Sequence, residues 1–208
     1  MTADGIVPDW VNPGRTALIV IDCQVDFGAP DGEMARRGAD MTAAQAALVK
    51  AESLTGAARA AGVRVLFVRL VTRGESKIAR GAKQRRGDDE PDLCVEGTRG
   101  ADFIGPQPQA GEAIVSKNHF SAFARTGLAE QLQAQGVDTL VLAGLTTECC
   151  VQSSAWDAFE HDFHVFIAGD ACAAYEEMLH RNALRALELS GAMVASAADF
   201  AAAWGKSF

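Results

Sequence analysis

Several features that would place a protein in a special class are missing from this chain of 208 residues. No apolar run reaches the roughly 18 residues that a membrane span needs. The N-terminal stretch 1–15 lacks the charged-then-apolar pattern of a secretory signal peptide. Basic residues number 19 against 27 acidic ones, a formal net charge of −8, which gives no electrostatic reason to expect nucleic acid or an anionic membrane as a partner.

A pattern of paired cysteines is also missing. The count of five is odd, and neither a CxxC motif nor a Cys/His cluster occurs. This pattern argues against a disulfide framework and against a structural zinc site, and it favours a reducing cytoplasm. The cysteines are Cys23, Cys94, Cys149, Cys150 and Cys172.

What the sequence does contain is apolar residues, at 49% of the chain, enough for a sizeable core. We expect one domain spanning residues 1–208. Strand-like apolar runs alternate with segments of helical periodicity, which predicts an α/β fold. The expected form is a three-layer α/β/α Rossmann-like sheet of about six mostly parallel strands with helices on both faces. The predicted strands are 16–21, 63–71, 113–116, 139–143, 164–168 and 192–195, and the predicted helices are 42–61, 121–135, 151–160, 175–189 and 199–204.

The segment 72–111 interrupts this alternation. It is too long for an ordinary connection, so we expect a functional, lid-like loop. Its first part, 72–86, carries six basic residues and one acidic residue, a local net charge of +5. We hypothesise that Arg73 and Arg86, with Arg80, Lys83 or Arg85, receive a substrate carboxylate, because arginine pairs with carboxylates in a bidentate way. The alternatives are a solvated surface or a contact with a neighbouring subunit.

The stretch 140–151 joins a predicted strand to a predicted helix and places two cysteines at the turn. A thiol at the start of a helix lies near the positive end of the helix dipole, which favours the reactive thiolate. Backbone N–H groups at such a turn can also receive a developing oxyanion. The alternative is that Cys149 and Cys150 are small packing residues.

Two other polar residues come at equivalent places. Asp22 and Lys117, like Cys150, each follow the carboxyl end of a predicted strand, where open α/β sheets form their binding crevice. Asp22 could accept the thiol proton, and Lys117 would favour the thiolate electrostatically. Taken singly, Asp22 could be a turn or capping residue and Lys117 a surface lysine, so the joint pattern carries the hypothesis.

The motifs that contain these residues resemble the isochorismatase-like cysteine hydrolase superfamily, over about residues 16–195. The matching motifs are Asp22-x-Gln24-x-Asp26-Phe27, Gly97-Thr98-x-Gly100, Lys117-x-x-Phe120-Ser121-Ala122-Phe123, Gly144-x-x-Thr147-x-x-Cys150-Val151 with Asp157-Ala158, and Asp170-Ala171.

The resemblance implies a catalytic triad of Asp22, Lys117 and Cys150. Cys150 is preferred to Cys149 because it stands directly before Val151, as in the family motif, and adjacent helical residues point about 100° apart. The resemblance also implies a cis peptide between Leu145 and Thr146, with the backbone N–H groups of Thr146 and Cys150 forming the oxyanion hole. It places Phe27 and Phe120 at the substrate pocket, although packing in the core is an equal alternative for both.

Two departures from family patterns refine the expected activity. Nicotinamidases of the superfamily bind a metal through an Asp-x-His pattern after the second strand, and here segment 66–72 has no histidine, so we expect no metal site and no cofactor. True isochorismatases lack the cysteine. We therefore expect a cytoplasmic, cysteine-dependent amidohydrolase that cleaves a small amide, ureido or carbamoyl compound through a thioester.

The alternatives are an isochorismatase-type vinyl ether hydrolase that uses Asp22 as the acid, and a catalytically silent or redox-sensing scaffold. The resemblance further implies a homodimer or homotetramer.

Overall fold

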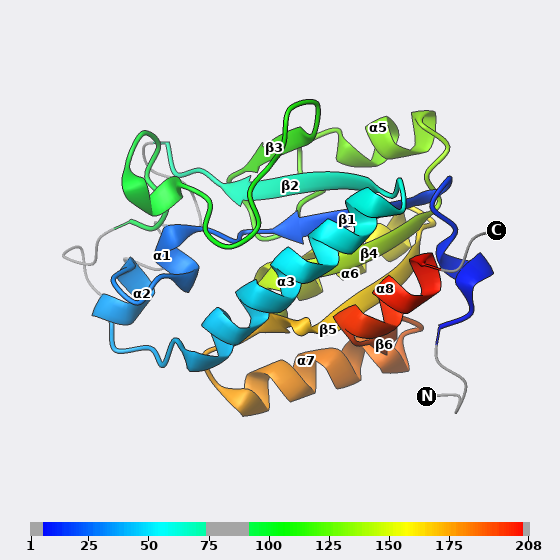
Figure 1. The fold of residues 1–208 in the computed structure, drawn as a ribbon. Helices are drawn as coiled ribbons and strands as arrows, with labels where there is room; N and C mark the ends of the chain where they lie inside the picture. Colours follow the sequence, from blue (N-terminus) through cyan, green and yellow to red (C-terminus); the bar gives the residue numbers. More distant parts are fainter. Residues whose placement is uncertain (1–5, 74–91, 206–208) are drawn as a thin grey trace.

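The computed structural model describes residues 6–73 and 92–205. Within them a six-stranded, all-parallel sheet runs in the order β3-β2-β1-β4-β5-β6 (Figure 1). The chain therefore adds strands on one side of β1 and then returns to add β4, β5 and β6 on the other. The strands are β1 (Thr16–Ile21), β2 (Arg64–Leu70), β3 (Ala113–Lys117), β4 (Thr139–Leu145), β5 (His164–Ala173) and β6 (Met193–Ala195).

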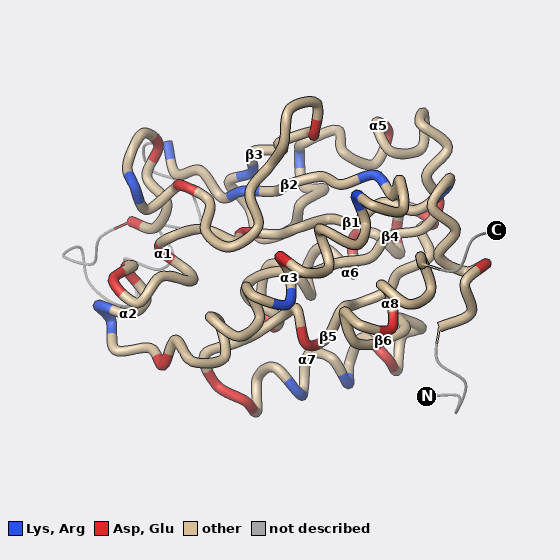
Figure 2. Tube along the Cα trace, in the orientation of Figure 1, with Lys and Arg blue, Asp and Glu red and all other residues tan. Residues whose placement is uncertain are grey.

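Central strands of such a sheet are covered on both faces, which explains their continuous apolar sequences. Every residue of β1 and β4 is buried, and neither strand carries a charge, whereas Figure 2 shows charged residues on the helices and connecting segments. Neighbouring residues of a strand point to opposite faces. Leu18 and Val20 accordingly belong to one core cluster, and Ala17, Ile19 and Ile21 to the other.

The helices divide between these two cores. Helices α3 and α8 contribute to the cluster that contains Leu18, while α5, α6 and α7 contribute to the cluster that contains Ile19. Figure 1 shows α3 and α8 lying across the same face of the sheet. The helices are α1 (Val25–Gly28), α2 (Glu33–Arg36), α3 (Thr42–Ala60), α5 (Leu128–Ala134), α6 (Gln152–Glu160), α7 (Glu177–Leu189) and α8 (Ala197–Trp204). The three-layer α/β prediction is thus confirmed.

The predicted helix 121–135 was wrong over its first half, since only α5 is helical. Arg125 and Gly127 adopt positive φ angles of 61° and 70°, which a helix cannot accommodate. Upstream, the Ser121 Oγ accepts a hydrogen bond from the Phe123 N–H, and Thr126 Oγ1 donates to the Ala122 carbonyl. Such short-range side-chain bonds compete with helix formation.

Smaller differences concern element ends and short elements. Strand β4 continues to Leu145 and β5 to Ala173, beyond the predicted ends, while a π-helical turn, Thr147–Val151, precedes α6. Helices α1 and α2 and the 3₁₀ turns Pro8–Val11 and Arg99–Ala101 have only three or four residues each, too few to show a periodicity. Residues 74–91 of the expected lid-like loop lie outside the described part. No helix among the described residues is long and apolar enough to cross a membrane.

Candidate active site

The residues proposed for catalysis lie at the carboxyl edge of the sheet, where strand order reverses. Asp22 directly follows β1, and the turn with Cys150 follows β4, which is hydrogen-bonded to β1. Lys117 is the last residue of β3, on the other side of β1. In open α/β sheets this reversal point holds the binding crevice.

Asp22 has an unusual backbone conformation that turns the chain out of the strand. Its φ is +49°, in the left-handed region that non-glycine residues rarely adopt. Its N–H still bonds to the Val68 carbonyl of β2 (2.9 Å), and its own carbonyl accepts from the Gln24 N–H (2.8 Å). The carboxylate is therefore fixed at the strand end, fully buried.

Lys117 joins the other two members of the site. Its Nζ lies 2.6 Å from Asp22 Oδ2, 3.4 Å from Cys150 Sγ and 3.1 Å from the His119 carbonyl oxygen. The side chains of Lys117 and Asp22 are both fully buried. Asp22 Oδ1 is buried too, and no hydrogen-bond partner for it occurs within the described ranges.

Cys150 is held in the turn Thr147–Val151 at the start of α6. The Ser154 hydroxyl donates to the Cys150 carbonyl (2.6 Å) and accepts from the Ala122 N–H (2.9 Å), so one side chain links the turn to the segment after β3. The Cys150 side chain is buried, whereas Cys149 is half-buried. All five cysteines are free thiols.

Burial and charge shift the titration of all three groups. Burial raises the pKa of Asp22 above its ordinary value, while the ammonium of Lys117 opposes that rise. Burial alone would lower the pKa of Lys117, but the charges of Asp22 and Cys150 outweigh it, and the pKa is raised. A hydrogen bond with Cys149, burial and the Asp22 carboxylate raise the pKa of the Cys150 thiol well above its usual range. The resting site therefore holds a thiol beside a carboxylate whose proton affinity is increased.

The backbone before the cysteine turn has two special features. The Leu145–Thr146 peptide is cis, at the position that the resemblance implied. Gly144 has a φ of +124°, and a Cβ there would collide with the carbonyl oxygen of Ile21 on β1. Only glycine allows β1 and β4 to approach each other at this point. The carbonyl of Thr146 accepts hydrogen bonds from the N–H groups of Cys149 and Val151.

The residues expected to bind substrate differ from one another in how deeply they are buried. Phe27, in α1, is 9% exposed and belongs to the core cluster on the α3 side, and its carbonyl accepts a bond from the Tyr175 hydroxyl (2.9 Å). Phe120, after β3, is 46% exposed. Arg73 forms an ion pair with Glu96 at 2.6 Å, with both side chains more than half exposed. Arg86 lies outside the described residues, as do Arg80, Lys83 and Arg85.

Two motif residues position the site in ways that the sequence did not reveal. The Gln24 amide accepts from the Leu70 N–H and donates to the carbonyls of Leu70 and Ala101, which ties the end of β2 to the following loop. Asp26 accepts bonds from the N–H groups of Glu33 and Cys94. Membership of the Asp-x-Gln-x-Asp motif was the available signal, but it did not indicate these partners.

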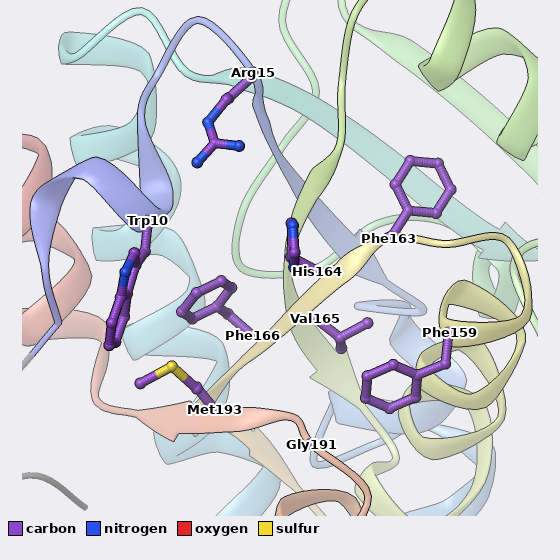
Figure 3. A pocket seen from close by; sticks show the side chains of 9 residues that line it. All are labelled: Trp10, Arg15, Phe159, Phe163, His164, Val165, Phe166, Gly191 and Met193. Atoms are coloured by element: carbon purple, nitrogen blue, oxygen red, sulfur yellow. The ribbon is translucent and has the colours of Figure 1, made fainter.

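No group of three or more His, Cys, Asp or Glu residues suited to a metal ion occurs in the part of the chain that is described. A cavity of about 380 Å³ lies at the opposite edge of the sheet, beside the amino ends of β5 and β6, and Figure 3 shows its largely aromatic lining. It is remote from Cys150, since His164 begins β5 whereas Cys150 follows the end of β4. Its lining includes Trp10, Arg15, Phe159, Phe163, His164 and Met193.

Comparison with known proteins finds relatives in sequence and in architecture. A family model described as Isochorismatase domain matches residues 16–199. The ureidoacrylate amidohydrolase RutB of Methylobacterium radiotolerans is 30% identical over 95% of this chain and 83% of its own. The maleamate amidohydrolase of Pseudomonas putida is 35% identical over 74% of this chain and 70% of its own. A cysteine hydrolase structure from Pseudomonas syringae pv. phaseolicola superposes with a TM-score of 0.81 at 25% identity, covering 98% of both chains.

Proposed function

Because this chain belongs to the isochorismatase domain family, we propose that it is a cysteine-dependent amidohydrolase whose nucleophile is Cys150. Relatives named as amidohydrolases support the coarser assignment, a hydrolase of C–N bonds other than peptide bonds. The finer assignment concerns the mechanism and the substrate, and it depends on the geometry at the carboxyl edge of the sheet.

One observation carries the mechanism. The Lys117 ammonium contacts Asp22 Oδ2 at 2.6 Å and Cys150 Sγ at 3.4 Å inside a buried site. A cation between a carboxylate and a thiol stabilises either of them as an anion, so a proton can pass from sulfur to Asp22 without leaving an unpaired negative charge. Because the three side chains are buried, this electrostatic support is stronger than at a surface.

The reaction then proceeds in two halves. Asp22 takes the Cys150 proton, and the thiolate attacks the substrate carbonyl to form a tetrahedral oxyanion, which the N–H groups of Thr146 and Cys150 receive. Collapse of this species breaks the C–N bond while Asp22 protonates the departing nitrogen, so ammonia or an amine leaves and a thioester remains. Asp22 next removes a proton from water, which hydrolyses the thioester and restores the thiol. Lys117 keeps its proton throughout.

We propose a small amide, ureido or carbamoyl compound with a carboxylate as the substrate. The names ureidoacrylate and maleamate, which belong to two relatives, both denote a C–N compound with an acid group. Arg73 and the basic residues that follow it would receive that carboxylate. We also propose a homodimer or homotetramer, which rests only on the resemblance to the isochorismatase-like superfamily.

Ammonia release from a panel of small amides and ureides tests this function. Cys150→Ala and Cys150→Ser should abolish turnover, and Cys149→Ala, the matched control one residue away, should keep most of it. In wild type, rapid acid quenching followed by tandem mass spectrometry, which separates the adjacent Cys149 and Cys150 by their fragment ions, should find the acyl group on Cys150.

Other outcomes would point to the alternatives. Activity that survives in Cys150→Ala would favour acid catalysis of the vinyl ether type, with Asp22 as the acid. Loss of activity in Cys149→Ala, together with an acyl group on Cys149 in the wild-type protein, would show that Cys149 and not Cys150 is the nucleophile. A wild-type protein without hydrolysis and without a reactive thiol would favour a silent scaffold.

A further inference from the structure

The turn that carries Cys150 is contacted by a side chain from a distant element. His180, in the first part of α7, places its Nδ1 2.8 Å from the Thr147 hydroxyl, across a separation of 33 residues. Thr147 is fully buried and is the first residue of the π-helical turn. Neither the triad nor the oxyanion hole uses His180.

The turn needs support of this kind because its backbone hydrogen bonding is irregular. A π-helical turn departs from the i to i−4 pattern of an α-helix, and such turns are common at functional sites. Its second half is held by Ser154, which donates to the Cys150 carbonyl. The contact from His180 holds its first half, and α7 packs along the turn.

The chemistry of the imidazole suits this contact. Burial lowers the pKa of His180, so the ring is neutral at pH 7 and can be either donor or acceptor at Nδ1 according to its tautomer. A hydroxyl can match either role. The hydrogen bond therefore fixes the orientation of Thr147 whichever group donates.

We infer that His180 is a positioning residue for the nucleophile and acts through Thr147. Thr147 stands between the cis peptide that ends at Thr146 and Cys150 three residues later. A displaced Thr147 moves the thiol away from the Lys117 ammonium, the 3.4 Å contact on which the proposed proton transfer depends. This inference deepens the proposed function and rests on it, because it assigns a role within the same site.

The position of the contacting nitrogen allows a sharp experiment. The amide of asparagine can occupy the place of Nδ1, whereas that of glutamine reaches the place of Nε2. His180→Asn should therefore keep the contact, and His180→Gln and His180→Leu should lose it. Thr147→Val removes the hydroxyl from the other side, and Thr147→Ser retains it. His164→Leu, at the opposite edge of the sheet, is the matched control.

We expect His180→Leu and Thr147→Val each to lower kcat by about 5- to 100-fold with KM nearly unchanged, since small misplacements of a reacting group have effects of that order. The double variant should be no slower than the worse single variant, because both changes remove the same contact. His180→Asn and Thr147→Ser should stay within about 3-fold of wild type, on the scale of one retained hydrogen bond. Thermal unfolding of every variant shows that the compared proteins are folded.

A second measurement does not require the substrate. The rate at which iodoacetamide alkylates Cys150, distinguished from Cys149 by fragment ions in tandem mass spectrometry, should change in His180→Leu. It should stay at the wild-type value in His180→Asn and His164→Leu. Multiplicative losses in the double variant, or an asparagine variant no better than the leucine variant, would overturn the inference. The wild-type protein could hydrolyse no amide while the alkylation rate of Cys150 still changes with the His180 substitutions as expected. That result would overturn the proposed function alone.

Discussion

Removing either partner of the buried Asp22–Lys117 pair should destabilise the protein, with opposite dependence on pH. In Lys117→Met the carboxyl of Asp22 has lost its cation, so it folds in its neutral form. The ordinary pKa of this group is 3.8. At about 1.4 kcal/mol per pH unit, holding it neutral at pH 7 costs at most about 4.5 kcal/mol.

The complementary variant, Asp22→Asn, leaves Lys117 without its carboxylate. Burial then lowers the pKa of the amine, and it folds in its neutral form. Its ordinary pKa is 10.5, so the same arithmetic gives at most about 5 kcal/mol at pH 7. Both values agree with the roughly 3–5 kcal/mol typical of breaking a buried ion pair.

The signs follow from the direction of each shift. In Lys117→Met the folded pKa of Asp22 lies above the unfolded value, so the loss of stability is small near pH 4 and grows as the pH rises. In Asp22→Asn the folded pKa of Lys117 lies below the unfolded value, so the loss is largest at low pH and shrinks as the pH rises towards 10.5.

Urea unfolding at pH 5.5 and pH 8.5, each variant against wild type at the same pH, measures these losses. The double variant Asp22→Asn/Lys117→Met leaves neither the buried carboxylate nor the buried ammonium without a partner, so it should recover most of the stability, but no activity. Losses below about 1 kcal/mol in both single variants, the size seen for exposed pairs, would refute the reasoning. So would the same pH dependence in both.

Three further predictions concern the surroundings of the site. Turnover should survive exhaustive chelation, because the Asp-x-His pattern is missing and a thiolate needs no metal-activated water; loss of activity that added zinc, iron or manganese restores would contradict this. Arg73→Ala should lower kcat/KM for carboxylate-bearing amides far more than for neutral ones if Arg73 exchanges its partner Glu96 for substrate, and equal losses would assign it to the surface or an interface. Gly144→Ala should lower the free energy of unfolding, measured by denaturant titration, by at least about 3 kcal/mol. The added Cβ meets the Ile21 backbone, and the residue has a positive φ. A change within about 0.5 kcal/mol would show that β1 and β4 can move apart at this point.

The sequence predicted the sheet well because buried parallel strands have a simple signature. Continuous apolar runs such as 16–21 identify strands, and glycines such as Gly62 and Gly136 mark where helices end. Segment 121–127 misled the prediction because its apolar residues have helical spacing, while Ser121 and Thr126 form local hydrogen bonds instead. Such competition depends on side-chain geometry that periodicity does not report.

For the site, the motifs indicated which residues could converge but not how they are held. The placement of Asp22, Lys117 and Cys150 at strand ends follows from the alternation of strands and helices. The contacts of Gln24 and His180 could not be foreseen, because each partner is chosen by packing between elements far apart in the chain. The directions in which the pKa values of Asp22 and Cys150 shift likewise depend on burial that only the folded chain defines.

The long sequence separations within the site bear on how the chain folds. Lys117 and Asp22 are 95 residues apart, and Cys150 is a further 33 beyond Lys117. Contacts of such high contact order form slowly, because the entropy of closing the intervening loops must be lost before the contacts stabilise them. During synthesis, a nascent chain that ends before β4 contains Asp22 and Lys117 but lacks both this strand and the proposed nucleophile Cys150 that follows it. Reactivity of the Cys150 thiol towards a substrate should therefore arise only when the central sheet is complete, which would make it a reporter of the last stages of folding.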